Sequence, residues 1–206
     1  MKSSNATARA LWRPALVFLG LLALPAAAQP EAAALAEARY AAEADHLWRV
    51  GVWGAANVAA GTGLLLASSG ARRRAFGVQS AAWGAINVTI AAVGLATSGE
   101  PAPPGLAEAV AAESRLGDIL WLNMGLNVGY VAVGTTLVAV GSRAAVARPD
   151  AWRGHGAAVI VQGIGLLVLD GVALAGSLDR SGRLLELVES VALRPVPGGV
   201  GLVVGL

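Results

Sequence analysis

Six polar side chains lie inside long apolar stretches of this 206-residue chain, and they are its candidates for chemistry. One of them, Asp170, is ionisable, and an unpaired carboxylate in hydrocarbon costs several kcal/mol. The others carry an amide or a phenol, which can donate or accept a hydrogen bond. The set consists of Asn57, Asn87, Asn123, Asn127, Tyr130 and Asp170. The role of these residues depends on what surrounds the stretches that contain them.

Four stretches are almost free of charge: residues 50–71, 75–99, 119–142 and 154–178. Asp170 is the one formal charge within them. About 20 apolar residues let an α-helix cross a bilayer, whereas helices of a soluble bundle carry a charged face. The hydrophobic fraction is 56% and the mean hydropathy is +0.64. We therefore predict an all-α integral membrane protein, a four-helix bundle of two antiparallel hairpins with spans of about 50–69, 77–97, 119–140 and 156–177.

The predicted spans bring one polar residue from each helix to a similar depth. At about 1.5 Å per residue from the outer end of each span, Asn57, Asn87, Asn127 and Asp170 fall roughly 10 to 15 Å deep. Asn123 lies one turn above Asn127 and Tyr130 about one turn below it, so the third helix has a polar face, which we predict to face the bundle interior.

This polar layer has two interpretations. Its members hydrogen-bond one another and fix the helix register, an interaction typically worth about 0.6 kcal/mol per pair. Alternatively, they line a pocket that also holds an ion, a proton or a small ligand, because ionisable residues inside a membrane often mark functional sites.

The first residues are typical of a secretory signal peptide. Three basic residues precede an apolar run over 15–24, and alanines 26–28 form a cleavage site before Gln29, so residues 1–28 are the predicted signal peptide. The remaining chain has twelve basic and thirteen acidic residues, a balance that gives no electrostatic basis for nucleic-acid binding. Cysteine is absent, which excludes disulfides and thiolate metal sites.

The connections between the spans differ in their arginine content. The first carries Arg72, Arg73 and Arg74, the second carries Arg115, and the third carries Arg143, Arg148 and Arg153. Cytoplasmic loops are enriched in basic residues. This pattern predicts a multi-pass protein of the bacterial inner membrane whose mature N- and C-termini are periplasmic.

The flanking segments are polar enough to leave the bilayer. Residues 29–49 predict a periplasmic amphipathic helix with an apolar stripe of Ala36, Tyr40, Ala44 and Leu47, either on the membrane surface or extending the first span. A short helix is predicted at 106–113, after a proline-rich turn. Residues 179–206 predict a short amphipathic helix followed by a hairpin or extended tail.

Other motifs argue against an enzyme, and we expect no cofactor and no metal. His46 and His155 lie at opposite ends of the predicted bundle and cannot share one haem iron. No nucleotide-binding, zinc-protease or serine-hydrolase motif occurs. Trp48, Trp53 and Trp121 are interpreted as interfacial anchors.

Small residues recur in the spans. The segment WGAANV at 53–58 returns as WGAINV at 83–88, which indicates either an old duplication or tight packing. Gly125 and Gly129 have the GxxxG spacing that lets two helix backbones approach closely.

The segments 83–87, 121–142 and 154–171 resemble a family of exported bacterial four-helix membrane proteins known as a domain of unknown function. The resemblance covers about residues 47–177. The family pattern has a G-x-D/N-x-G-Y segment in the third helix, matched by Gly125, Asn127, Gly129 and Tyr130, and a Q-G…D segment in the fourth, matched by Gln162, Gly163 and Asp170. Asn127 stands where the pattern also allows aspartate, which argues against a relay of two carboxylates.

We therefore expect a non-enzymatic structural or accessory protein that acts by association in the bilayer, as a homo-oligomer or with another membrane protein. The alternative is a small channel or transporter subunit with a solute site at the polar residues.

Overall fold

The computed structural model describes residues 28–98, 105–190, 193–196 and 199–202. Nearly all of them belong to four helices: α3 (Ala28–Ala67), α4 (Ala71–Thr97), α5 (Leu106–Gly141) and α6 (Pro149–Ser190). Each helix contains a window long and apolar enough to cross a membrane, so the predicted helical architecture with four candidate spans is confirmed. The predicted signal peptide lies outside the described residues except for Ala28.

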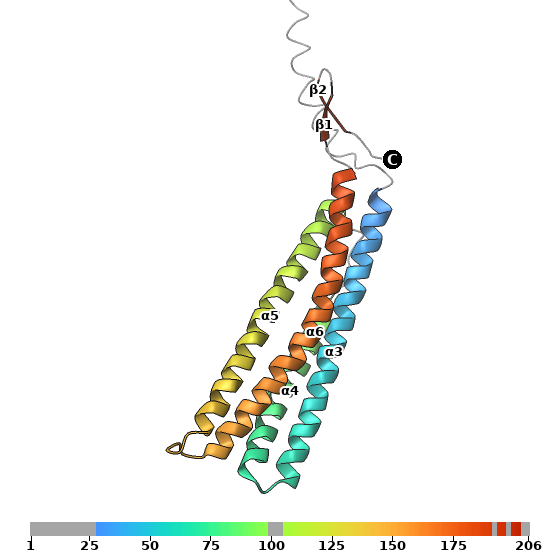
Figure 1. Cartoon of the computed structure of the whole chain (residues 1–206). Helices are drawn as coiled ribbons and strands as arrows, with labels where there is room; N and C mark the ends of the chain where they lie inside the picture. The colour runs from blue at the N-terminus through green and yellow to red at the C-terminus, as the bar shows by residue number, and fades with distance from the viewer. Residues whose placement is uncertain (1–27, 99–104, 191–192, 197–198, 203–206) are drawn as a thin grey trace, which may run out of the picture.

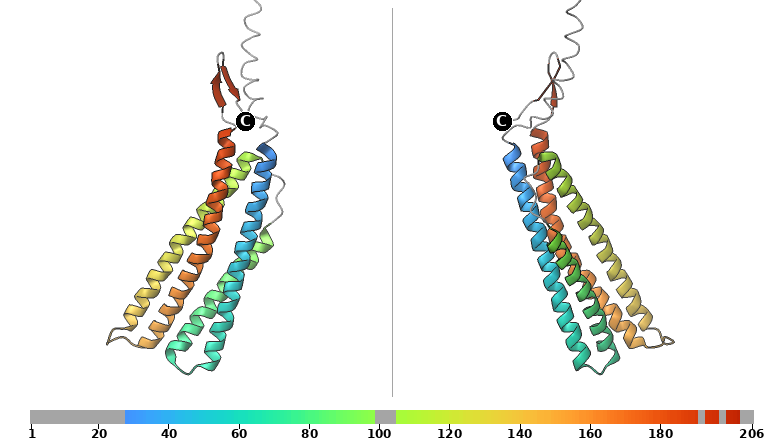
Figure 2. Two further views of the ribbon diagram at one scale, coloured as in Figure 1. Left: turned by 45° about the vertical axis from the view of Figure 1, so that its right-hand side comes forward. Right: turned by 180° about the vertical axis from the view of Figure 1, so that it is seen from behind.

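The helices form two antiparallel hairpins, α3 with α4 and α5 with α6 (Figure 1). Helix α6 also packs against α4 and α3, which places it at the centre of the bundle. In contrast, α4 and α5 share almost no contacts, and α6 is visible between them from behind (Figure 2). The bundle is therefore open along the side between α4 and α5.

Glycines bring the two helices of the first hairpin into backbone contact. A Cβ on Gly54 would lie 2.7 Å from the carbonyl oxygen of Gly84, and a Cβ on Gly84 would lie 2.5 Å from that of Gly54. Gly61 and Gly77 face each other in the same way. These contacts are reciprocal, so the glycines of the WGAANV and WGAINV segments serve the tight packing of α3 on α4.

The second hairpin has a similar seam. Gly134 and Gly156 face each other, and a Cβ on either would lie 2.6 to 2.7 Å from the opposite carbonyl oxygen. Each helix carries buried glycines seven residues apart, a spacing that returns to the same helix face in left-handed packing. These pairs are 54/61, 77/84, 134/141 and 156/163. In contrast, Gly125 and Gly129 meet no neighbouring atom within 4 Å, so the predicted GxxxG contact is not made within this chain.

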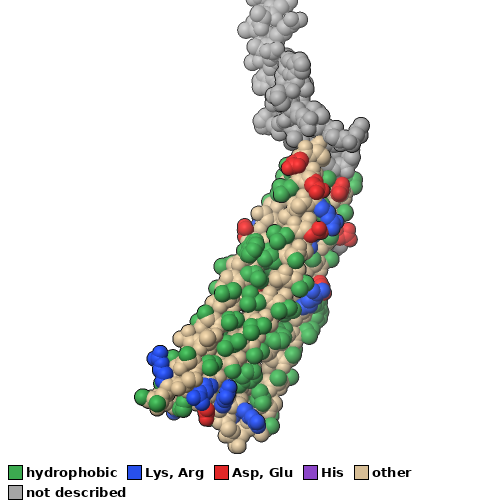
Figure 3. Space-filling model, viewed as in Figure 1, with side chains coloured by type: hydrophobic (Ala, Val, Ile, Leu, Met, Phe, Trp, Pro, Cys, Tyr) green, Lys and Arg blue, Asp and Glu red, His purple; other side chains and the backbone are tan. Residues whose placement is uncertain are grey.

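Arginines gather at the end where α3 connects to α4 and α5 to α6, here called the arginine end (Figure 3). Arg72, Arg73 and Arg74 belong to the first turns of α4, and Arg153 belongs to α6, rather than to the predicted loops. Arg74 donates to the carbonyls of Leu65 and Ser68 and so helps to close the tight α3–α4 turn.

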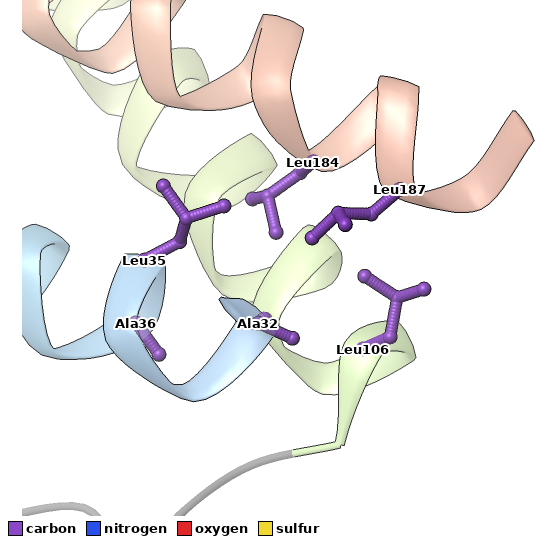
Figure 4. Packing of buried hydrophobic residues seen from close by; sticks show 7 residues of the cluster. Ala32, Leu35, Ala36, Leu106, Leu184 and Leu187 are labelled. Carbon is purple, nitrogen blue, oxygen red and sulfur yellow. The ribbon is translucent and has the colours of Figure 1, made fainter. Parts of the chain in front are cut away.

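At the opposite end, α3, α5 and α6 continue as a three-helix stalk, residues 28–45, 106–118 and 177–190. Its core contains alanines and leucines from all three helices (Figure 4), among them Leu35, Leu106 and Leu184. Residues 29–49 therefore extend the first span, with Ala36 buried and the rest of the predicted stripe half-buried. The separate helices predicted at 106–113 and after residue 181 are wrong, because both segments continue α5 and α6 without a break.

A buried ion pair joins α5 and α6 at the base of the stalk. Arg180 donates from Nε to Oε2 of Glu113 over 2.8 Å, and the Ser177 hydroxyl donates to Oε1 over 2.6 Å. Beyond α6, β1 (Leu193–Val196) and β2 (Gly199–Leu202) pair antiparallel, so the tail contains a hairpin, one of the two predicted forms.

Candidate functional site

The polar residues inside the bundle form two groups, and the first is centred on Gln162 of α6. The Gln162 side-chain amide donates to Oδ1 of Asn57. Its carbonyl oxygen accepts from the Trp53 indole over 3.0 Å and from the Asn87 amide over 3.4 Å. One α6 side chain thus joins α3 and α4, and Gln162 is only 1% exposed. We call Trp53, Asn57, Asn87 and Gln162 the glutamine cluster.

The second group is centred on Asp170, two turns nearer the stalk along α6. The Asn127 amide of α5 donates to Oδ2 of Asp170 over 2.6 Å. His46 Nε2 of α3 lies 3.1 Å from the other carboxylate oxygen. Asp170 is 4% exposed and Asn127 is 3% exposed. We call His46, Asn127 and Asp170 the aspartate cluster.

The prediction of a single polar layer is therefore wrong in its geometry. Asn127 is bonded to Asp170, but Asn57 and Asn87 are bonded to Gln162. The count from span ends failed because the charge-free stretches are not in register with one another. Helix α3 is at the level of Asp170 already at His46, four residues before its charge-free stretch begins.

The interpretation of Trp53 as an interfacial anchor is also wrong. Its indole nitrogen is bonded to Gln162, and its ring lies against Gly165 so closely that a Cβ there would overlap the ring. Gly165 therefore accommodates the Trp53 ring, while Gly163 lets α6 approach the Asn127 carbonyl of α5. Trp48 and Trp121 are 63% and 58% exposed, as expected of anchors.

A cavity of about 310 Å³ occupies the open side between α4 and α5. Five of the six predicted site residues line it, and Asn57 alone does not. These five are Asn87, Asn123, Asn127, Tyr130 and Asp170, and His46 and Glu43 of α3 line it as well. The structure thus brings together most of the predicted residues, but around a cavity rather than in a closed layer.

The cavity is long, and its two ends differ chemically. On α5 its lining runs from Leu116 to Tyr130, a rise of about 20 Å. Along α5, Asn127 of the aspartate cluster is about one helical turn from Tyr130. The stalk end carries Glu43, whereas the other end is formed by Trp83 and Tyr130, whose ring centroids are 4.9 Å apart. Leucines and isoleucines form much of the wall between them.

Charges near the cavity are paired. Glu43 lies 2.7 Å from Arg39 one turn away, and Asp170 has His46 as its partner. Over the described residues, no group of three or more His, Cys, Asp or Glu side chains is arranged to hold a metal ion. The chemistry on offer is hydrogen bonding within a mostly apolar cavity.

Sequence reasoning missed His46 and Trp53 as parts of these clusters and Glu43 as part of the cavity lining, and it named Gln162 only through the family resemblance. A signal for His46 was present, because His46, Val50, Trp53 and Asn57 follow one another at spacings of four, three and four residues. Such spacing places side chains on one helix face. It shows the polar face of α3 continuing past the charged pair of Asp45 and Arg49.

Comparison with family models identifies the chain. Residues 49–171 match the family of unknown function DUF6992, which is more than half of the chain, so the protein belongs to that family. The matched segment contains the glutamine cluster, and of the aspartate cluster it lacks only His46. No curated protein and no solved structure matches the chain.

Proposed function

We propose that this member of the DUF6992 family is a non-enzymatic, accessory protein of the bacterial inner membrane that binds a small amphipathic molecule between α4 and α5. The observation that carries the proposal is the cavity itself, in which a buried carboxylate, a buried amide and a half-buried imidazole lie in a mostly apolar wall. Polar residues that only fix the helix register need no cavity, because their amides are satisfied by direct hydrogen bonds such as those around Gln162.

The orientation follows from the charges. Six arginines lie at the arginine end and the acidic side chains of the stalk lie at the other (Figure 3), which favours a cytoplasmic arginine end and periplasmic termini. A phosphatase fused after Gly105 is then active, and one fused after Arg74 is inactive. Activity at both positions, or the reverse pattern, contradicts this topology.

The depth of the cavity follows from helix lengths. A hydrocarbon core of about 30 Å corresponds to about 20 helical residues. Twenty residues along α6 from Arg153 reach Ala173, and twenty back along α3 from Ala67 reach Leu47. Both counts place His46 and Asp170 near the periplasmic boundary, where exposed Trp48 and Trp121 also lie. The aromatic end of the cavity is then close to the middle of the bilayer.

These positions define the class of ligand. The aspartate cluster, placed near the boundary, suits a hydrogen-bonding head group, and the apolar wall suits a hydrocarbon or ring system that enters sideways from the bilayer. A volume of about 310 Å³ is at the small end of ligand pockets. The site therefore fits a single-chain or ring-bearing amphiphile better than a hydrated ion, which would meet mostly apolar wall.

The test is to identify what copurifies with the protein. The full chain is purified in mild detergent, extracted with organic solvent, and the extract is analysed by mass spectrometry. Leu126→Trp fills the cavity from α5, whereas Val128→Trp is a matched control because Val128 is exposed on the same helix and does not line the cavity. We expect a compound that is depleted in Leu126→Trp and retained in Val128→Trp. Equal extracts from both variants contradict the proposal.

A second candidate function is self-association through α5. Gly125 and Gly129 leave a smooth strip on its outer face, with no neighbouring atom within 4 Å, and small residues at this spacing favour close helix contacts in membranes. The chain has no cysteine, so Gly129→Cys introduces a single cross-linking position. Oxidised membranes should then contain a disulfide-linked dimer, and its absence would leave the strip facing lipid.

A further inference from the structure

We propose that a second groove, between the two hairpins at the arginine end, binds the head group of an anionic phospholipid. The groove has a volume of about 450 Å³ and lies between α3, α4 and α6. Its lining consists of Leu64, Arg72, Arg73, Phe76, Gly154 and Ala157. It shares no residue with the cavity between α4 and α5, so it is a separate site.

Its two arginines are free to bind an anion. Over the described residues, neither Arg72 nor Arg73 has an acidic partner within ion-pair distance. The neighbouring arginines are engaged, because Arg74 donates to α3 carbonyls and Arg153 lies 3.6 Å from Asp150. Guanidinium groups bind phosphate oxygens through paired hydrogen bonds.

The local charge favours an anionic partner. Between residues 54 and 98 and between 119 and 169, the chain carries six arginines and one acidic residue, Asp150. All seven lie near the arginine end, which gives it a net charge of about +5 before any partner binds. A groove in such a region concentrates anions and repels cations.

The remaining lining is apolar, which selects a lipid over a soluble anion. Leu64, Phe76 and Ala157 are half-buried and belong to the candidate spans, so the groove runs from the arginines toward the bilayer. Gly154 lets α6 pack closely against α4 at the bottom of the groove, because a Cβ there would overlap the Arg72 carbonyl and come within 2.8 Å of Ala75. A phospholipid fills both parts of the groove. Its phosphate binds the two arginines, and the first methylenes of an acyl chain lie along Phe76. Basic pockets between membrane helices have this character.

Native mass spectrometry of the full chain in detergent tests the proposal, with phosphatidylglycerol as the probe and phosphatidylcholine, a zwitterion of zero net charge, as the reference. The double variant Arg72→Gln/Arg73→Gln removes both guanidinium groups. Arg143→Gln/Arg148→Gln is the matched control, because it removes the same charge at the same end from residues outside the groove. We expect the first variant to lower the affinity for phosphatidylglycerol at least about tenfold and the control to change it less than about twofold.

Further arms identify the source of binding. Ala157→Phe fills the apolar part without changing the charge, and it should also weaken phosphatidylglycerol binding. Inorganic phosphate at equal concentration should not displace the lipid. Equal losses in both double variants would reveal only general surface attraction, and displacement by inorganic phosphate would reveal a site for free anions; either outcome overturns the proposal. Unchanged binding in Arg72→Gln/Arg73→Gln overturns it as well. Melting temperatures of all variants, measured in the same detergent, identify any loss of folding.

Discussion

The half of the bundle near the arginine end and the half near the stalk use the same four helices in different ways. Near the arginine end, glycines allow α3 to pack against α4, and α5 against α6, with their backbones in contact. The glutamine cluster then joins the first hairpin to α6, and of its members only Asn87 borders the cavity. Nearer the stalk, α4 and α5 stand apart, and the aspartate cluster faces a cavity of about 310 Å³.

This difference separates structure from function within one set of buried polar groups. The hydrogen bonds of the glutamine cluster join α6 to α3 and α4, and they fix the register of these helices. In the aspartate cluster the same kind of bonding holds a charge at the edge of an accessible space. Substitutions in the closed half should therefore change stability, whereas those in the open half should change binding.

The largest effect is expected at a glycine seam. Gly84→Leu places a side chain within 3 Å of the Gly54 carbonyl and the Val58 nitrogen, neither of which can move without separating α3 from α4. Overpacking commonly costs about 1–3 kcal/mol or more, and here backbone obstructs backbone, so we expect loss of the folded, detergent-stable protein in size-exclusion chromatography. Gly125→Leu is the control, since its side chain would enter open space. If Gly84→Leu elutes and melts like the wild type, the seam does not hold the hairpin.

The next effect is expected at the centre of the closed half. Gln162→Leu deprives Asn57, Asn87 and the half-buried Trp53 of a shared partner, and at about 1 kcal/mol for each group the loss is about 3 kcal/mol. We expect a melting temperature in detergent that is lower by about 6–12 °C. Gln79→Leu is the comparison, because Gln79 has the half-buried His155 as its side-chain partner. A Gln162 variant no less stable than the Gln79 variant would remove the distinction between the halves.

A smaller effect on stability, with a larger one on binding, is expected at Asp170. Asp170→Leu strands Asn127 and His46 and should cost about 1–3 kcal/mol. Asp170→Asn keeps an acceptor for Asn127 and should cost less than about 1 kcal/mol, yet it removes the charge at the head-group end of the cavity. We therefore expect Asp170→Asn to melt like the wild type while its solvent extract lacks the copurifying compound. An unchanged extract would mean that the aspartate cluster only fixes the helix register, as the glutamine cluster does.

The smallest effect on stability is expected at the aromatic end of the cavity. Within the part of the chain that the structure describes, the Tyr130 hydroxyl has no hydrogen-bonding partner, while its ring packs against Trp83. Tyr130→Phe keeps the ring, so the melting temperature should shift by less than about 2 °C. Tyr130→Ala removes the ring contact and should weaken retention of the compound. A large loss of stability in Tyr130→Phe would place the hydroxyl in the packing rather than in the cavity.

The helical part of the fold was predictable because hydrocarbon imposes simple rules. Long uncharged stretches such as 119–142 have the length and composition of candidate membrane spans, for which a helix satisfies its own backbone groups, and short connections make neighbouring helices run antiparallel. The stalk was harder to predict, because the charges of segments such as 106–113 resemble those of separate surface helices. Only the packing of Leu35, Leu106 and Leu184 shows that three helices continue together.

The site was only partly predictable. Composition alone identified Asp170 and the asparagines, because polar residues are conspicuous in apolar spans. Their partners depend on the rotation and offset of each helix, and these are set by glycine contacts such as Gly54 with Gly84 that no count of residues from a span end can reproduce. Trp53 illustrates the limit, because an indole near a span end suits the interface equally well until Gly165 provides space for it inside.

Helix α6 connects the aspartate cluster to the far end of the stalk as one uninterrupted rod of 42 residues. From Asp170 to Ser190 the rise is about 30 Å. A rod of that length that pivots by one degree moves its end by about 0.5 Å, so a slight change of tilt at Asp170 displaces the far end of the stalk. Because Arg180 is bonded to Glu113, the same movement is passed to α5. A small change in the tilt of α6 at the aspartate cluster would therefore be carried to the far end of the stalk.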